Sequence, residues 1–256
     1  MSIRGVKMDR KKLNDFYNSE KNQSHYTFSI DNVGLWESEK ILIEKYVSKN
    51  SKILDLGCGT GRTTINLYKL GYKNIIGLDY SEKLIECAKR YCINNNLNIN
   101  FKYGDATNLF EFESNSFDFV LFSYNGLMSI PRKENRDKVL EDVYRILKKD
   151  GIFIFTAHDR DNPKYKEIWK SEKEKWDMNL QDKNLFEFGD RLIKLEDGTV
   201  LFAHYSSVDE VKKFISNKNF ELIENKLRSE ICAEPERVTS WAKEDTMFYV
   251  VKKVWA

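Results

Sequence analysis

The sequence predicts an α/β fold built on a doubly wound, mostly parallel sheet. Short apolar segments alternate with amphipathic ones between residues 52 and 157, and this alternation is typical of parallel strands joined by crossover helices. Polar residues follow several of the predicted strands, at the edge where such sheets bind ligands. The chain has 256 residues, 41% of them hydrophobic and only three of them proline, which favours a single folded domain over a disordered chain.

Residues 1–34 are polar and aromatic, and we expect them to form a cap with a short helix near Asp9–Ser19. Apolar pairs recur at helical spacing in Leu35–Val47 and predict a second helix there. Four side chains of the cap either line an entrance to a site or pack on the core, and packing is the favoured interpretation: Tyr17, His25, Tyr26 and Phe28.

The segment 35–157 is the predicted core. Its strands are expected at Lys52–Leu56, Asn74–Asp79, Ile99–Tyr103, Phe117–Phe122 and Ile152–Ala157. Its helices are expected at Thr63–Leu70, after Ser81 and at Lys133–Leu147. Ser81 is a favourable N-cap residue, and Gly71 is suited to end the first of these helices.

The pattern changes after residue 157. Pro163 suits the first turn of a helix at Asn162–Trp176. A Glu-Asp-Gly turn between Arg191–Leu195 and Thr199–Tyr205 predicts a hairpin. We therefore expect 158–205 to be a helix-plus-hairpin insertion that acts as a lid. Residues 206–256 should form a helix and an antiparallel strand pair, at Val208–Asn217, Phe220–Leu227 and Met247–Val254.

A glycine-rich turn follows the first core strand. Gly57, Gly59 and Gly61 alternate, so the backbone can turn tightly and a ligand can approach it without meeting a Cβ. Thr60 and Thr63 could satisfy free N–H groups of the next helix. Cys58 is interpreted as a small residue that fits the turn. A dinucleotide site would require a small residue where Arg62 stands, which disfavours a nicotinamide dehydrogenase.

The pattern Asp55-x-Gly57-x-Gly59-x-Gly61-Arg62 resembles motif I of the class I S-adenosylmethionine-dependent methyltransferases. The resemblance extends over 35–157 and implies their Rossmann-like, seven-stranded sheet. It also implies S-adenosylmethionine as cofactor and S-adenosylhomocysteine as product. Arg62 would then pair with the methionine carboxylate, and the charge of Asp55 would favour the amino end.

The resemblance implies further binding residues at the ends of later strands. Asp79 matches the acid that binds the ribose, and Tyr80 could pack on adenine. The motif Gly104, Asp105 and Ala106 matches the adenine-binding turn, and Ser123, Tyr124 and Asn125 occupy the position where cofactor and acceptor meet. His158 is the candidate general base, because its ordinary pKa suits neutral pH. His25 and His204 are weaker candidates.

Composition limits the remaining classes. The net charge is +2, which provides no strong field for nucleic acid. Four cysteines lack Cys-x-x-Cys spacing and neighbouring histidines, so we expect reduced thiols, no metal site and a cytoplasmic location. No apolar run approaches the roughly 20 residues of a membrane span, and the polar first 12 residues do not resemble a cleavable leader. The fourth strand lacks the Asn/Asp-Pro-Pro-Tyr motif of adenine methylases.

We therefore expect a methyltransferase that acts on an oxygen or nitrogen of a small-molecule acceptor, with no membrane partner. The alternatives are an RNA or protein methyltransferase and a non-catalytic S-adenosylmethionine-binding protein. An aminopropyl transferase is disfavoured, because its decarboxylated donor would leave Arg62 without a carboxylate. Trp169 and Trp176 are expected to pack within the lid, and the mixed charges of Lys164–Lys175 indicate a solvated helix face. The oligomeric state is not predicted.

Overall fold

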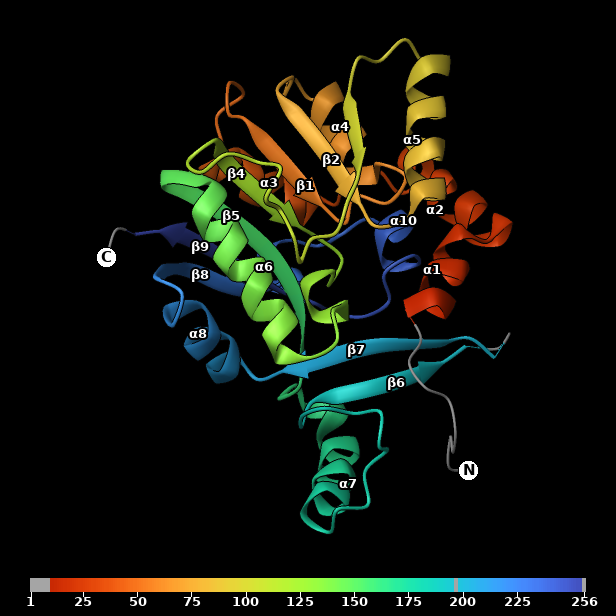
Figure 1. Cartoon of the computed structure of the whole chain (residues 1–256), viewed down its shortest axis with the longest axis vertical. Helices are drawn as coiled ribbons and strands as arrows, with labels where there is room; N and C mark the ends of the chain where they lie inside the picture. The colour runs from red at the N-terminus through yellow and green to blue at the C-terminus, as the bar shows by residue number, and fades with distance from the viewer. Residues whose placement is uncertain (1–9, 196–197, 255–256) are drawn as a thin grey trace.

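The computed structural model describes residues 10–195 and 198–254. A twisted sheet forms its centre (Figure 1), and seven strands of it run in the order β3, β2, β1, β4, β5, β9, β8. Strands β1 to β5 are mutually parallel, whereas β9 is antiparallel to both of its neighbours. The strands are β1 Ile53–Leu56, β2 Ile75–Asp79, β3 Asn100–Tyr103, β4 Phe117–Phe122, β5 Leu147–Asp159, β8 Phe220–Leu227 and β9 Met247–Lys253. The predicted doubly wound, mostly parallel sheet is confirmed.

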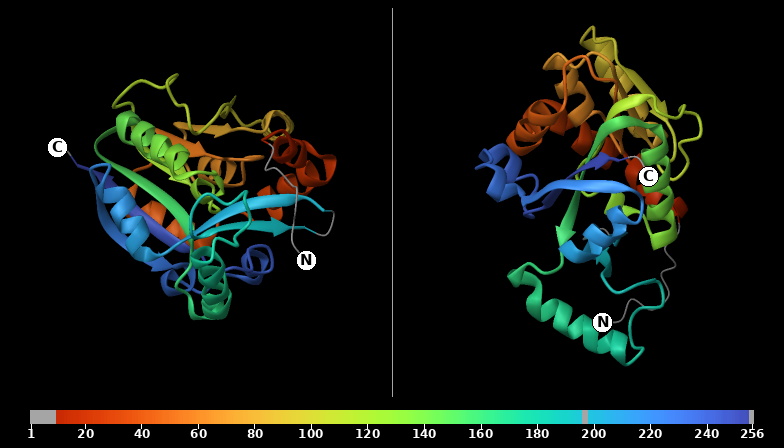
Figure 2. Two further views of the ribbon diagram at one scale, coloured as in Figure 1. Left: turned by 60° about the horizontal axis from the view of Figure 1, so that its bottom comes forward. Right: turned by 90° about the vertical axis from the view of Figure 1, so that its left-hand side faces the viewer.

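Helices cover both faces of this sheet, as Figure 2 shows. One face carries α6 (Lys133–Ile146) and α8 (Val208–Ser216), and the other carries α3 (Glu37–Tyr46), α4 (Arg62–Lys69) and α5 (Glu82–Asn94). Successive strand residues point to opposite faces, so neighbours on β4 serve different cores. Val120 packs with α6 residues and Phe119 with α3 residues, both without exposed surface. This double burial explains why the strands are continuously apolar.

The amino-terminal cap contains two helices, α1 (Arg10–Asn18) and α2 (Glu20–Asn32), where the sequence predicted one. Ser19 begins the second helix by accepting a hydrogen bond from the N–H of Asn22. Helix α2 is largely polar, and its carbonyl at Ile30 accepts a hydrogen bond from Asn66 of α4 at 2.9 Å. Tertiary contact rather than an apolar stripe therefore holds this helix. Asp9, the predicted helix start, lies outside the described residues.

The insertion after β5 contains the predicted helix and hairpin. Pro163 opens the short 3₁₀ helix η2 (Pro163–Tyr165), which α7 (Lys166–Asp177) continues. The hairpin strands are β6 (Asp190–Lys194) and β7 (Val200–Ser206). The first two residues of the predicted turn, 196–197, lie outside the described residues, as do residues 255–256 at the end of the last predicted segment.

The hairpin is joined to the sheet. Strand β7 pairs in parallel with the last two residues of β5, His158 with Tyr205 and Asp159 with Ser206. Helix α7 extends away from the sheet beyond this hairpin (Figures 1 and 2). We expected β5 to end at Ala157, and the pairing with β7 is the reason that it continues to Asp159. Movement of the insertion as a lid stays a prediction.

Three short elements lie at the carboxyl ends of the central strands. The 3₁₀ helix η1 (Leu127–Ser129) follows β4, and α9 (Arg228–Ile231) and α10 (Glu236–Thr239) join β8 to β9. None of the three was predicted, because each is too short to show periodicity. In the described part of the chain, no helix combines the length and apolar character needed to cross a bilayer.

Candidate functional site

The glycine turn has the conformation that its glycines predict. Gly57, Gly59 and Gly61 have φ values of 63°, 57° and 93°, which other residues rarely adopt. A Cβ would lie 2.7 Å from Phe122 at Gly57 and 2.8 Å from Phe101 at Gly61, but would meet nothing within 4 Å at Gly59. The outer glycines are therefore required by packing, and the middle one leaves open space beside the backbone.

Asp55 supports this turn from β1. Its Oδ2 accepts hydrogen bonds from the hydroxyls of Thr63 and Thr64, the latter at 2.6 Å. Burial raises the pKa of Asp55 to about 6, although the threonine hydrogen bonds oppose the shift. Asp55 thus attaches the start of α4 to the strand, and its predicted effect on the amino end of the ligand stays a prediction.

The expectation that Thr60 and Thr63 cap α4 is wrong. Gly61 is the N-cap and supplies no side chain, while the Thr63 hydroxyl is directed to Asp55. Within the described chain, the buried Thr60 Oγ1 has no hydrogen-bond partner. Cys58 is buried beside it, and burial raises the pKa of its thiol well above the usual range. Cys58 is therefore a packed thiol rather than a nucleophile.

Asp79, the last residue of β2, joins the glycine turn to the next helix. Its Oδ2 accepts from the N–H of Gly59 at 2.8 Å, and its Oδ1 accepts from the N–H of Ser81 at 2.7 Å. Burial raises the pKa of the Asp79 carboxyl, and these two backbone donors oppose the shift. Each carboxylate oxygen can accept more than one hydrogen bond, so the arrangement leaves acceptor capacity for a ribose diol.

The adenine-binding residues implied by the resemblance lie at the neighbouring strand end. Gly104 donates its N–H to the carbonyl of Asp79 at 2.9 Å. Asp105 Oδ1 accepts from the N–H and hydroxyl of Thr107 at 2.9 and 2.8 Å. Ala106 packs against the core. The exposed ring of Tyr80 lies 6.1 Å from that of Tyr103. The ends of β2 and β3 therefore bring these predicted residues together.

Arg62 has a partner that was not predicted. Its Nη1 and Nη2 bind the two carboxylate oxygens of Glu39 at 2.8 and 2.7 Å, and Nη1 also donates to the carbonyl of Gly34 at 2.8 Å. Ser123 donates its hydroxyl to the same carboxylate. The charge of Arg62 is thus compensated inside the protein, and its pairing with a methionine carboxylate stays a prediction. Glu39 also accepts from the N–H of Trp36 at 2.9 Å, as the third helical residue of a capping box does, but Trp36 lacks the N-cap hydroxyl by which a sequence indicates that motif.

The turn after β4 is conformationally unusual. Tyr124 and Asn125 have φ values of 53° and 58°, a conformation that costs on the order of 1–3 kcal/mol per residue. Asn125 is held by hydrogen bonds on three sides: its N–H donates to Thr156 at 2.7 Å, its Oδ1 accepts from Thr246 at 2.6 Å, and its Nδ2 donates to His158 at 3.2 Å. These contacts fix the turn at the end where the resemblance places the acceptor.

We expected His158 to follow the fifth strand, but it lies within β5. Its ring stacks on that of Tyr205 with centroids 4.4 Å apart, and its Nε2 accepts from Asn125. Burial lowers the pKa of His158 to about 4. The imidazole is therefore neutral at pH 7, but too weakly basic to remove a proton efficiently there. Its predicted role as a base gains no support from this environment.

The cap helices lie over the ends of β2 and β4. Asn18 at the end of α1 accepts from the hydroxyl of Ser81 at 2.7 Å. Burial, followed by the charges of Asp79 and Tyr124, raises the pKa of Tyr17 to about 12. Burial also raises the pKa of Tyr26 well above its usual range, with smaller contributions from Tyr17, Tyr124 and Asp79. Tyr17 and Tyr26 thus lie beside the predicted binding residues rather than in the core alone. Of the other two cap aromatics, Phe28 is exposed and His25 stacks on Trp241 at 3.9 Å.

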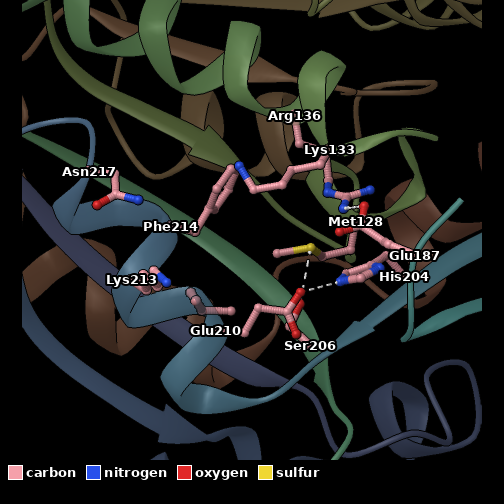
Figure 3. A pocket seen from close by; sticks show the side chains of 11 residues that line it. Met128, Lys133, Arg136, Glu187, His204, Ser206, Glu210, Lys213, Phe214 and Asn217 are labelled. Carbon is pink, nitrogen blue, oxygen red and sulfur yellow. Dashed lines mark hydrogen bonds and ion pairs between the residues drawn. The ribbon is translucent and has the colours of Figure 1, made fainter. Parts of the chain in front are cut away.

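A second charged cluster borders a cavity of about 170 Å³ between α6, β7 and α8 (Figure 3). The buried His204 binds Asp190 through Nδ1 and Glu210 through Nε2, both at 2.8 Å. These carboxylates raise the pKa of His204 despite its burial. Glu187, His204 and Glu210 lie close enough to hold a metal ion, but Arg136 and Arg160 already pair with the two glutamates. We interpret the cluster as an ion-pair network that attaches the hairpin to α8.

Comparison with known proteins identifies the family. A family described as a methyltransferase domain matches residues 47–247. A demethylmenaquinone methyltransferase of Lactobacillus johnsonii is 40% identical over 123 residues, which are 46% of this chain and 48% of that protein. A sterol 24-C-methyltransferase of Aspergillus fumigatus is 31% identical over 130 residues, 48% of this chain and 33% of that protein. The chain thus spans half or less of the length of these relatives.

The fold is shared with solved structures. A S-adenosylmethionine-dependent methyltransferase from Methanosarcina mazei superposes with a TM-score of 0.68 at 23% identity, covering 84% of this chain and 98% of that one. At this identity the likeness concerns the fold alone. The family match covers most of the chain, and it includes the glycine turn and the strand ends described above. The chain therefore belongs to the class I S-adenosylmethionine-dependent methyltransferase family.

Proposed function

We propose that this protein transfers a methyl group from S-adenosylmethionine to a small-molecule acceptor. The observation that carries the proposal is the hydrogen bond between Asp79 and the N–H of Gly59. It places a partly buried carboxylate beside the one glycine of the turn that faces open space. A nucleoside with a ribose diol is the ligand that suits a carboxylate at the end of the second strand. Family membership supports the same assignment.

The residues at the strand ends fit this cofactor. Asp79 would accept from the ribose hydroxyls, Tyr80 and the turn at Asp105 and Ala106 would contact adenine, and Ser123 to Asn125 would lie at the amino-acid end. The buried Thr60 hydroxyl, which has no partner among the described residues, adds a polar group that a ligand could satisfy. When bound, S-adenosylmethionine supplies a methyl group already activated by its sulfonium. The protein then chiefly positions the acceptor and excludes water.

The acceptor atom is proposed to be an oxygen or nitrogen that binds without its proton. His158 is the nearest candidate base to the β4 turn, and its pKa of about 4 makes it ineffective at pH 7. An acceptor that is already deprotonated needs no base. Carbon is the second candidate, because one relative is named as a sterol 24-C-methyltransferase. The experiments below would also reveal the two alternatives, which are an RNA or protein acceptor and cofactor binding without turnover. We also propose a cytoplasmic location.

Calorimetry tests the cofactor. S-adenosylmethionine should bind and NAD should not. Asp79→Ala should weaken binding at least tenfold, about 1.4 kcal/mol, through loss of the diol hydrogen bonds. Asp118→Ala is the matched control, because Asp118 also accepts a backbone N–H, from Lys52 at 2.8 Å, but near the other end of the sheet. An unchanged affinity of Asp79→Ala would remove Asp79 from the site.

A metabolite screen tests the acceptor. Wild-type protein and S-adenosylmethionine are incubated with fractionated small molecules, and S-adenosylhomocysteine release is measured. Turnover with a small-molecule fraction is expected. Release only with bulk tRNA or protein would overturn the proposed acceptor class, and tRNA binding should then weaken steeply with salt. Cofactor binding without release in any fraction or in cell extract would indicate a non-catalytic binding protein.

A further inference from the structure

Arg228, the first residue of α9, is a buried cation without a compensating anion. Arg228 is 5% exposed, and within the described residues its buried Nη1 has no hydrogen-bond partner. No acidic residue in the described chain forms an ion pair with it. A buried charge that lacks an anionic partner is costly, since it has lost water, and its cation–π contact with Trp36 recovers only part of that loss. Arg62 differs, because Glu39 binds both of its terminal nitrogens.

The side chain of Arg228 packs against an aromatic ring. Its guanidinium carbon lies 5.1 Å from the centre of the Trp36 ring, and that ring lies 5.8 Å from Tyr124. Within the described residues, the buried Trp36 Nε1 also has no hydrogen-bond partner. Burial raises the pKa of Tyr124, and the charges of Arg62 and then Arg228 oppose this rise. Two buried groups that can only donate therefore lie near one exposed tyrosine.

Hydrogen bonds connect Arg228 to the turn after β4, where the acceptor is proposed to bind. The N–H of Arg228 donates to the carbonyl of Thr246 at 2.9 Å. The Thr246 hydroxyl hydrogen-bonds with Asn125 Oδ1 at 2.6 Å and with the carbonyl of Ala157 at 3.0 Å. Arg228 thus follows β8, in the carboxyl-terminal part of the chain, and Thr246 connects it to the ends of β4 and β5. The predicted cofactor residues come instead from the ends of β1 to β4.

We propose that Arg228 binds a carboxylate of the methyl acceptor, and that the acceptor is an aromatic or similarly planar carboxylic acid. A guanidinium matches a carboxylate through two parallel hydrogen bonds. The indole N–H of Trp36 supplies a third donor, and the exposed ring of Tyr124 supplies an apolar surface for a planar molecule. This inference rests on the proposed methyl transfer, and it identifies the class of molecule that receives the group.

The test uses benzoate and its uncharged analogue benzamide as probes on the full chain saturated with S-adenosylhomocysteine. By calorimetry, wild-type protein should bind benzoate at least tenfold more tightly than benzamide. Arg228→Gln should abolish this preference, and Arg228→Lys should retain part of it. Arg237→Gln is the control, since Arg237 lies on the same segment but is half-exposed and pairs with Glu37. Equal binding of both probes, or a preference that survives in Arg228→Gln, would overturn the proposal.

Two further measurements separate other causes. S-adenosylhomocysteine affinity should be unchanged in Arg228→Gln. A tenfold loss, with unchanged binding of methylthioadenosine, which has no carboxylate, would assign Arg228 to the donor and overturn its role with the acceptor. If the variant does not fold, the melting temperature of wild-type protein serves: benzoate should raise it and benzamide should not. Failure to bind S-adenosylhomocysteine would refute the proposed function, whereas the probe comparison on free protein still tests the carboxylate site.

Discussion

At the scale of single residues, the candidate site contains a buried ion pair between Arg62 and Glu39. Arg62, Glu39 and Ser123 form one buried, hydrogen-bonded group next to the glycine turn. Breaking a buried ion pair by removing one partner leaves the other charge uncompensated. The two charges of this group are therefore more tightly coupled to folding than the exposed ion pairs of the surface.

Glu39→Gln should lower the free energy of unfolding by about 3–5 kcal/mol, because it leaves Arg62 buried without its anion. Urea denaturation measures this loss. The control is Glu37→Gln, whose carboxylate is 42% exposed and lies 3.5 Å from Arg237; it should change stability by less than about 1 kcal/mol. A loss at Glu39 no larger than at Glu37 would contradict the interpretation. The double variant Glu39→Met, Arg62→Met should recover much of the stability.

The three histidines should titrate in different ranges. Burial holds the pKa of His158 at about 4 and lowers that of His25, whereas two carboxylates raise that of His204. Between pH 5 and 6.5, His158 should remain neutral while His204 stays protonated. Nuclear magnetic resonance of the imidazole carbons, assigned with single His→Gln variants, measures these values. A His158 pKa near 6.5 would restore it as a candidate base.

At the scale of elements, the hairpin β6–β7 is held at two places. Its β7 strand pairs with the end of β5, and His204 binds Asp190 of β6 and Glu210 of α8. A protonated His204 stabilises this network below the ordinary histidine pKa of about 6.5. The contribution is lost as pH rises through the elevated pKa. The attachment of the hairpin should therefore weaken in alkaline solution.

His204→Gln should release the hairpin. Hydrogen bonds that involve a charged group contribute about 1.5–3 kcal/mol each, so amide exchange in β6 and β7 should accelerate at least tenfold, while β1 and β4 remain protected. Exchange mass spectrometry at pH 6.5 follows this difference. His25→Gln is the matched control, because His25 lies on α2, outside the hairpin network, and stacks on Trp241. Equal acceleration in all strands would show that His204 supports the whole fold instead.

At the scale of the whole molecule, one buried carboxyl should be visible in the pH dependence of stability. The pKa of Asp55 is about 6 in the folded protein against 3.8 ordinarily. The folded state therefore binds more protons than the unfolded state between these values, and stability falls as pH rises through this window. The loss should be about 3 kcal/mol, since each pKa unit corresponds to about 1.4 kcal/mol.

Asp55→Asn should flatten this part of the curve. The free energy of unfolding of wild-type protein and of the variant is measured in urea at pH 4, 5, 6 and 7. From pH 4 to pH 7, wild-type protein should lose about 3 kcal/mol of stability relative to the variant. Because other titrating groups are common to both proteins, they cancel in the difference. A difference that does not vary with pH would mean that Asp55 titrates normally.

The sequence indicated the sheet, the glycine turn and the order of strand ends, because these depend on local patterns. Ser81 caps α5 as predicted, and Gly57 and Gly61 are required where motif reasoning placed them. Glu39, Thr246 and Arg228 were not predicted, since they reach the site through tertiary contacts, such as Arg62 to Glu39, Ser123 to Glu39 and Thr246 to Asn125, that local sequence patterns do not show. Helix α2 was missed because its apolar residues are sparse.

The parallel pairing of β7 with the end of β5 has a mechanical consequence. Strand β5 pairs with β9 along Ile152–Ala157 and with β7 at His158 and Asp159. A displacement of the hairpin must therefore also displace His158 and Asp159 or break their pairing with β7. His158 is connected through Asn125 to Thr246, and the N–H of Arg228 donates to the Thr246 carbonyl. Hydrogen bonds thus connect the end of β5 to the turn after β4 and to the start of α9. The insertion is thus coupled to the carboxyl ends of the strands, and a displacement of the hairpin should be transmitted along β5 to the turn after β4.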